Sequence, residues 1–151
     1  MHNRLIKNEL MKKLELSIEI MATKEKVWDA LWQEEKYKNW NSVFMQGSYA
    51  ESDWKEGSEI RFLSPGENGM FGIIEKMIPF EKMYFKHLGE IQNGVKQAET
   101  YGEEATERYD LKEENGKIKL SETMNAQEEY LIYFTNTFPK ALEKIKEISE
   151  K

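Results

Sequence analysis

The sequence contains no cysteine and only two histidines among its 151 residues. Without cysteine, the chain has no disulfides, no thiolate metal ligands and no cysteine nucleophile. The chain has one credible histidine ligand, scattered acids and no helical His-x-x-x-His pair, so it lacks a good set of ligands for zinc. The acids around Gly57 lack the spacing of a calcium loop. The sequence therefore predicts neither a metal site nor another cofactor.

Positive charge and long apolar runs are also scarce. The formal net charge is -6, and lysines are mixed with glutamates without forming a basic stripe. Phosphate binding needs a concentrated basic surface, so we expect no nucleic-acid partner. No run approaches the ~20 apolar residues of a membrane span, and residues 1–10 lack the apolar region of a secretory signal. We therefore expect a cytoplasmic protein with no membrane span.

Motifs of nucleophilic catalysis and phosphate binding are missing as well. No Gly-x-Ser-x-Gly elbow occurs, and Ser48, Ser58 and Ser64 have no neighbouring base in the sequence. Residues 66–72 contain glycine but lack the Lys-Ser/Thr ending of a phosphate loop. The sequence leaves open whether the protein is an enzyme, and it favours a binding protein.

Length and composition suit one folded domain. Aromatic residues make up 12% of the chain and eight methionines add bulk, while 33% charged residues keep the surface hydrophilic. Residues 1–10 are polar and show no strand alternation, and the patterned part of the chain begins at Met11. We expect a loose N-terminal extension over residues 1–10 and a single domain over residues 11–151.

Residues 125–148 have the pattern of a long amphipathic helix. Apolar side chains such as Phe138 and Leu142 fall on one side of a helical wheel, and Lys144 falls on the other. Such a helix must place its apolar side against another surface. Pro139 lies on the polar side, where it either bends one helix or begins a second one, and we favour one bent helix.

The chain before this helix consists mostly of short alternating segments. Residues 14–20 have the period-two pattern of a half-buried strand, and Thr23 is a suitable N-cap for the helix that follows. A second short helix is expected near residues 35–40, and Asn115 with Gly116 predicts a tight hairpin turn. The six later strands are expected at residues 43–50, 59–63, 70–78, 82–89, 105–111 and 117–123. Because the strands are grouped, we expect an α+β domain with an antiparallel sheet of about seven strands.

Six short motifs occur in a characteristic order along the chain. They are Ala22 with residues 25–28, then residues 37–40, 53–57, 72–79 and 105–109, and finally residues 138–142 with 145–146. In this order they resemble the START-like superfamily, also called SRPBCC or helix-grip. The nearest likeness is to its branch of bacterial homologues of heat-shock-chaperone ATPase activators, over roughly residues 14–148.

This resemblance implies a curved antiparallel sheet of seven strands that grips the C-terminal helix, with a cavity between the two. It implies little about a reaction, because the superfamily includes lipid carriers, cyclases, hydrolases and proteins with no assigned role.

His87 and Glu107 are the candidate acid–base residues. His87 shares strand parity with Met83 and Phe85, and if that face turns inward its imidazole lies on the cavity wall, where it is able to move a proton. The alternative is a histidine that bonds to a neighbouring strand or faces solvent. Glu107 shares parity with Tyr109, and an acid between apolar walls suits acid–base work. The alternatives for Glu107 are an ion pair with Arg61 or a position at a wet rim.

Aromatic residues provide the candidate cavity wall. Most of them are expected to pack in the core, but a sheet curved round a helix also leaves an apolar pocket with a few polar groups. We expect the first half of the C-terminal helix to cover this pocket and the second half to anchor the helix. The candidate ligand-binding residues are Trp40, Phe44, Phe62, Phe71, Phe85, His87, Glu107, Tyr109, Tyr130, Phe134 and Phe138.

Three functions remain open on the sequence alone. The favoured one is binding of a small apolar or amphipathic molecule under the C-terminal helix. The second is a cyclase-like or hydrolase-like enzyme that uses His87 and Glu107. The third, suggested by the family resemblance, is a module that modulates a chaperone. An exposed edge strand is compatible with a monomer or a weak homodimer.

Overall fold

The computed structural model describes residues 11–151, and the predicted N-terminal extension lies outside the described residues. The described part begins with strand β1 (Met11–Ile20), followed by the short helices α2 (Lys24–Trp32) and α3 (Glu34–Asn41). The later strands are β2 (Tyr49–Ser52), β3 (Glu59–Ser64), β4 (Asn68–Ile78), β5 (Lys82–Gln92), β6 (Val95–Lys96), β7 (Thr106–Glu114) and β8 (Lys117–Gln127). Helix α4 (Glu128–Glu150) ends the chain. This order confirms the predicted α+β class.

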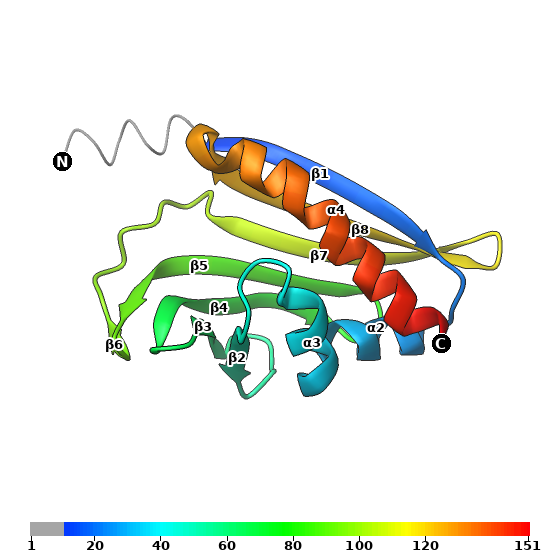
Figure 1. Cartoon of the computed structure of the whole chain (residues 1–151), viewed down its shortest axis with the longest axis horizontal. Coiled ribbons are helices and arrows are strands. Elements are labelled where there is room, and N and C mark those ends of the chain that lie inside the picture. The colour runs from blue at the N-terminus through cyan, green and yellow to red at the C-terminus, as the bar shows by residue number, and fades with distance from the viewer. Residues whose placement is uncertain (1–10) are drawn as a thin grey trace.

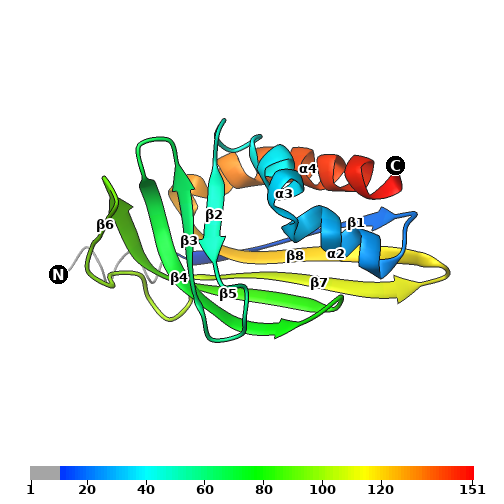
Figure 2. The same ribbon diagram turned by 90° about the horizontal axis from the view of Figure 1, so that it is seen from below.

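One antiparallel sheet contains all the described strands. Its order is β1-β8-β7-β5-β4-β3-β2, and the short strand β6 pairs with β5. β1 pairs with β8 over its whole length, from Met11 opposite Gln127 to Ile20 opposite Ile118. Figures 1 and 2 show the three helices on one side of the curved sheet, with α4 lying across it. The arrangement is the helix-grip fold that the resemblance implied.

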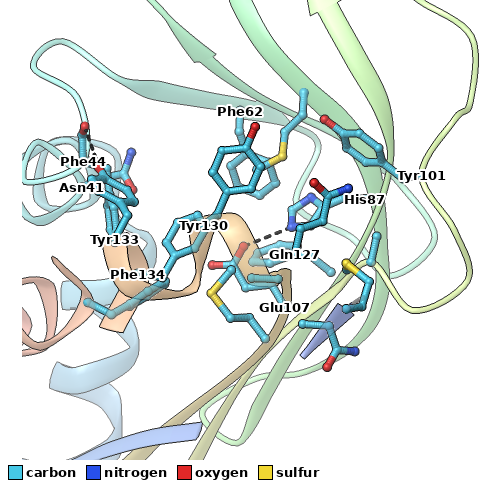
Figure 3. A pocket seen from close by; sticks show the side chains of 18 of the residues that line it. Asn41, Phe44, Phe62, His87, Tyr101, Glu107, Gln127, Tyr130, Tyr133 and Phe134 are labelled. Atoms are coloured by element: carbon cyan, nitrogen blue, oxygen red, sulfur yellow. Dashed lines mark hydrogen bonds and ion pairs between the residues drawn. The ribbon is translucent and has the colours of Figure 1, made fainter. Parts of the chain in front are cut away.

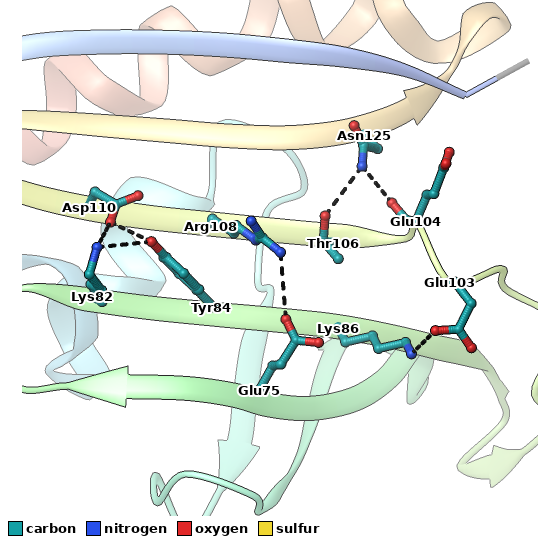
Figure 4. A network of polar contacts seen from close by, with 10 residues as sticks. All are labelled: Glu75, Lys82, Tyr84, Lys86, Glu103, Glu104, Thr106, Arg108, Asp110 and Asn125. Carbon is teal, nitrogen blue, oxygen red and sulfur yellow. Dashed lines mark hydrogen bonds and ion pairs between the residues drawn. The ribbon is translucent and has the colours of Figure 1, made fainter.

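Alternating side chains explain why the helices cover only one face of the sheet. On β5, the buried Met83 and Phe85 alternate with the half-buried Lys82 and Tyr84. Figure 4 shows the opposite face, where the Lys82 Nζ atom and the Tyr84 hydroxyl both contact Asp110 Oδ1, at 2.9 and 2.7 Å. One face is therefore polar and hydrated, and the other holds the core, as is usual for an antiparallel sheet covered on one side.

Local sequence signals account for two of the connections. Thr23 caps α2, and its Oγ1 atom accepts a hydrogen bond from the Lys26 backbone N–H at 3.2 Å. Asn115 and Gly116 both have positive φ angles, 51° and 78°, which the hairpin turn between β7 and β8 requires. Both predictions are confirmed.

The predicted strand over residues 43–50 is wrong for most of its length. The chain turns there, because the Phe44 backbone N–H donates to the Asn41 carbonyl at 3.0 Å, and β2 begins only at Tyr49. The Phe44 ring packs 4.8 Å from the ring of Phe138 on α4, measured between centroids. The apolar residues of this segment therefore belong to a connecting turn that packs against α4, and they do not form a strand.

Helix α4 is continuous from Glu128 to Glu150, with the exposed Pro139 inside it. The alternative of a second helix beginning at Pro139 is therefore wrong. The predicted start at residue 125 is three residues early, because β8 continues to Gln127. None of the described helices is both long and apolar enough to cross a membrane.

The two halves of α4 differ sharply in burial. Of the buried residues, Ala141, Leu142, Ile145 and Ser149 lie in the second half, and Phe138 lies one residue before the midpoint. Burying the three largest contributes roughly 5–9 kcal/mol gross, an upper estimate from about 1.5–3 kcal/mol per side chain. In the first half, Tyr130 is 53% exposed and Tyr133 is 46% exposed. The second half thus anchors the helix, and its first half is held much less tightly.

Candidate functional site

A cavity of about 860 Å³ lies between the inner face of the sheet and the first half of α4. Figure 3 shows side chains from the sheet and from α4 pointing into it. Tyr130 and Thr100 line its rim and are exposed, so the cavity opens to solvent. This volume falls in the range of about 300–1,000 Å³ that small-molecule sites occupy.

Aromatic rings in mutual contact form the deep wall of the cavity. The Trp32 ring meets the rings of Tyr109 and Phe85 edge-on, with centroids 5.1 and 5.5 Å apart. Phe85 in turn meets Phe62 edge-on at 5.2 Å. Edge-to-face contacts of this kind hold rings in place. The wall therefore combines a largely apolar surface with a fixed shape.

A short hydrogen-bonded chain of His87, Glu107 and Tyr109 is the polar element of this wall. The His87 Nε2 atom lies 3.1 Å from Glu107 Oε1 (Figure 3), and the Tyr109 hydroxyl donates to Glu107 Oε2 at 2.5 Å. Burial, and then the charge of Glu107, raise the pKa of the Tyr109 hydroxyl well above its usual value. Tyr109 therefore keeps its proton and acts as the donor.

Backbone pairing explains how residues twenty positions apart come together. His87 belongs to β5, whereas Glu107 and Tyr109 belong to β7, the next strand in the sheet. The His87 backbone N–H donates to the Ala105 carbonyl at 2.8 Å, and Phe85 pairs with Glu107. Both side chains then point to the inner face. His87 therefore faces inward and also bonds to a residue of the neighbouring strand. The two alternatives that the sequence left open both apply to it.

An irregularity in β5 directly follows His87, and it allows both His87 and Glu90 to line the cavity although they are three residues apart. Phe71 pairs with Gly89 and Gly72 pairs with His87, which leaves Leu88 as an extra residue on β5. A bulge of this kind changes which face the following side chains take. Gly72 is needed opposite His87, because a Cβ atom there would lie 2.1 Å from the Lys86 carbonyl oxygen.

Of the eleven candidate ligand-binding residues, all but Phe71 line the cavity. Phe71 belongs instead to a separate cluster with Leu63 and Ile91. Strand alternation is the reason: its neighbour Met70 lines the cavity, so Phe71 falls on the other face of β4. The prediction for Phe71 is therefore corrected.

The proposed ion pair between Glu107 and Arg61 is not formed. The Arg61 Nε atom instead lies 2.8 Å from Glu59 Oε2. A wet rim position does not describe Glu107 either, since its side chain is only 15% exposed.

Glu122 is a buried acid that the sequence analysis did not single out. It is fully buried on β8 opposite Tyr109, and neither carboxyl oxygen has a hydrogen-bond partner within residues 11–151. Burial, and then the nearby charge of Glu107, raise the pKa of the Glu122 carboxyl far above its usual range. A signal was available, since Glu122 stands between Leu120 and Met124 in an inward-facing alternation.

In the described part of the chain, no three histidine, aspartate or glutamate residues gather closely enough to hold a metal ion. The arrangement of the cavity nevertheless allows acid–base chemistry. The imidazole of His87 and the carboxyl of Glu107 face one space, within hydrogen-bond reach of each other.

Comparison with solved structures finds the same fold in several bacterial proteins. The Aha1 dimer of Colwellia psychrerythraea matches with a TM-score of 0.69 and 19% identity, over 92% of this chain and 96% of that one. CalU16 of Micromonospora echinospora matches with a TM-score of 0.64 and 16% identity, over 92% and 76%. A protein of Cytophaga hutchinsonii matches with a TM-score of 0.65 and 21% identity, over 90% and 92%. At these identities the likeness extends to the fold alone.

No curated protein sequence matches the chain at a significant level. A family model does match, and it covers residues 21–150, from the end of β1 almost to the end of α4. The span includes both strands that carry the polar chain of the cavity. The protein therefore belongs to the family described as Activator of Hsp90 ATPase homolog 1-like protein, within the START-like superfamily.

Proposed function

We propose that the protein binds a small apolar or amphipathic molecule in the cavity under α4. The observation that carries this proposal is the cavity itself, about 860 Å³ in volume and walled largely by aromatic rings. Its one buried polar chain, from His87 through Glu107 to Tyr109, suits the orientation of a ligand with a polar end. Apolar walls with few polar groups are typical of small-molecule sites.

The exposed first half of α4 supports the same proposal. Tyr130, Tyr133 and Phe134 line the cavity, yet the first two are about half exposed. A ligand in the cavity covers apolar surface on these residues, at about 25 cal/mol per Å² removed from water. Ligand binding therefore stabilises this half of the helix together with the whole fold.

Thermal-shift measurements against libraries of lipids and aromatic compounds, followed by native mass spectrometry of the hits, test the proposal. A ligand should raise the melting temperature and add its own mass to the protein. The variant Ala126→Leu adds bulk to a buried residue of the cavity wall and should weaken binding by about tenfold or more. The same replacement at the exposed Ala98, which does not line the cavity, is the control. Equal binding by both variants would place the ligand elsewhere.

A second candidate, acid–base catalysis, is favoured by the contact between His87 and Glu107. The 3.1 Å separation and the shared cavity meet the geometric requirement for a proton-transfer pair. Turnover of activated esters and enolisable diketones should be measured for the protein and for Glu107→Gln. Glu113→Gln, an exposed position on the same strand, is the matched control. Activity that survives Glu107→Gln rejects the role of the pair.

Two predictions from the family likeness remain to be tested. The family description names activation of the Hsp90 ATPase, and an ATPase assay with purified Hsp90 that is unchanged by this protein would reject a role there. The Colwellia relative is described as a dimer, and sedimentation over a concentration series distinguishes a monomer from a weak homodimer for this protein.

A further inference from the structure

We propose that the cavity selects an amphipathic molecule whose polar end is a hydrogen-bond donor or a cation, such as an amine, over one that ends in a carboxylate. This inference rests on the proposed binding function, because it names the ligand class for the same cavity. Its basis is the set of donors, acceptors and charges that the wall presents.

The Glu107 carboxyl has acceptor capacity to spare. A carboxylate offers about four acceptor positions. His87 Nε2 contacts one oxygen and the Tyr109 hydroxyl donates to the other, so two positions are used. These contacts also fix the carboxyl in place. Because the Glu107 side chain is only 15% exposed and lines the cavity, a ligand replaces water as the partner of its unused positions.

His87 adds no free donor to this end of the cavity. The residue is 8% exposed, and its Nδ1 atom is buried without a hydrogen-bond partner in the described chain. When Nε2 carries the proton shared with Glu107, Nδ1 of the neutral imidazole is an acceptor. An ammonium or hydroxyl group of a ligand is able to donate to the unused positions of Glu107, whereas a deprotonated carboxylate has no proton to donate.

Among residues 11–151, no lysine or arginine lines the wall to balance a carboxylate. The lining residues in the described part of the chain include two acids, Glu90 and Glu107, but no lysine or arginine. Lys86, next to His87, is not a lining residue, and its Nζ atom lies 2.7 Å from Glu103 (Figure 4). The Trp32 Nε1–H, which has no hydrogen-bond partner among the described residues, is a neutral donor. A buried anion without a counter-ion is costly, so this wall disfavours one.

Three ligands that share the same alkyl chain and differ only in their polar end test this preference. Decylamine, decanol and decanoate should be titrated below their aggregation limits at neutral pH, with isothermal calorimetry or tryptophan fluorescence as the readout. Trp32 and Trp40 line the cavity and report on its occupation. A charge-assisted hydrogen bond to Glu107 should make decylamine bind about tenfold or more tightly than decanoate. Decanol should fall between the two.

Two variants test whether Glu107 is responsible for the preference for the amine. Glu107→Gln should reduce the preference for the amine to within about threefold while decanol still binds. Glu113→Gln removes the same charge at an exposed position of the same strand and should leave the preference unchanged. Equal binding of all three compounds, or tighter binding of decanoate, overturns the head-group inference and leaves the binding function intact. Failure of all three to bind counts against both.

Discussion

Replacing the buried Glu122 with methionine should stabilise the protein, and the gain should increase with pH. Glu122 is fully buried, and its carboxyl oxygens have no hydrogen-bond partner among residues 11–151. Burial, and then the charge of Glu107, raise its pKa far above the usual value of 4.5. The folded protein therefore keeps this proton at neutral pH, whereas the unfolded chain releases it.

The size of the effect follows from proton linkage. Above pH 4.5 the unfolded state binds fewer protons than the native state, so the free energy of unfolding falls as pH rises. One group contributes about 1.4 kcal/mol per pH unit, or roughly 3 kcal/mol between pH 5 and pH 7. Methionine has similar length and no charge to lose, so Glu122→Met should be more stable than the native protein by about 3 kcal/mol at pH 7.

Urea unfolding at several pH values between 5 and 8 measures this difference. The Glu59 carboxyl, whose pKa is lowered mainly by hydrogen bonds from Lys96 and Arg61, loses its contribution only below about 4.5, outside the window. Glu113→Met, at an exposed position of the neighbouring strand, should follow the pH dependence of the native protein. A variant Glu122→Met that is less stable than the native protein at every pH would refute the reasoning, because it would mean that the carboxyl is ionised and paired in the fold.

Three further changes test how the fold supports the cavity, each by urea or thermal unfolding. Gly72→Ala should destabilise by about 3 kcal/mol, because its Cβ atom would lie 2.1 Å from the Lys86 carbonyl oxygen; an unchanged stability would contradict the close pairing of β4 with β5. Pro139→Ala should stabilise by about 1–2 kcal/mol, since the backbone hydrogen bond regained by the helix outweighs the entropy gained by the unfolded chain; a loss would show that the proline is needed. Trp40→Phe removes the buried hydrogen bond from Nε1 to the Leu31 carbonyl at 3.0 Å and should cost about 2 kcal/mol; no loss would mean that the carbonyl finds another partner.

The unequal burial of the two halves of α4 explains why the cavity lies under the first half of the helix. The second half of the helix packs through Leu142 and Ile145, with Phe138 buried next to the midpoint, and these contacts hold the whole helix against the sheet. The first half carries the exposed Tyr130 and Tyr133 above the cavity. Few buried contacts in a segment correspond to a low local free energy of opening. This half is therefore the part of the molecule best suited to admit a ligand.

Local pattern predicted most of the elements and their order, although it missed the short strand β6. The useful signals each depend on neighbours along the chain: the alternation in residues 14–20, the Thr23 cap, the Asn115 and Gly116 turn, and the apolar stripe ending at Ile148. Such signals need no knowledge of distant residues, and together they predicted an α+β domain, whereas the helix-grip arrangement came from the family resemblance. The local signals failed at residues 43–50. The side chains there are typical of a strand, but the segment forms a turn that packs against α4.

The chemistry of the cavity was decided by strand pairing, which the sequence does not show directly. Pairing of β5 with β7 brings Glu107 to His87, and alternation on β4 sends Phe71 to the other face of the sheet. A shift of one residue in register moves every side chain of a strand to the other face of the sheet. Residues that the pattern alone predicts to face inward therefore need confirmation by the register. The sequence by itself determined that this protein has a sheet gripping a helix. Only the tertiary structure decided that a cavity remains there and which polar groups face it, because both depend on contacts between strands far apart in the chain.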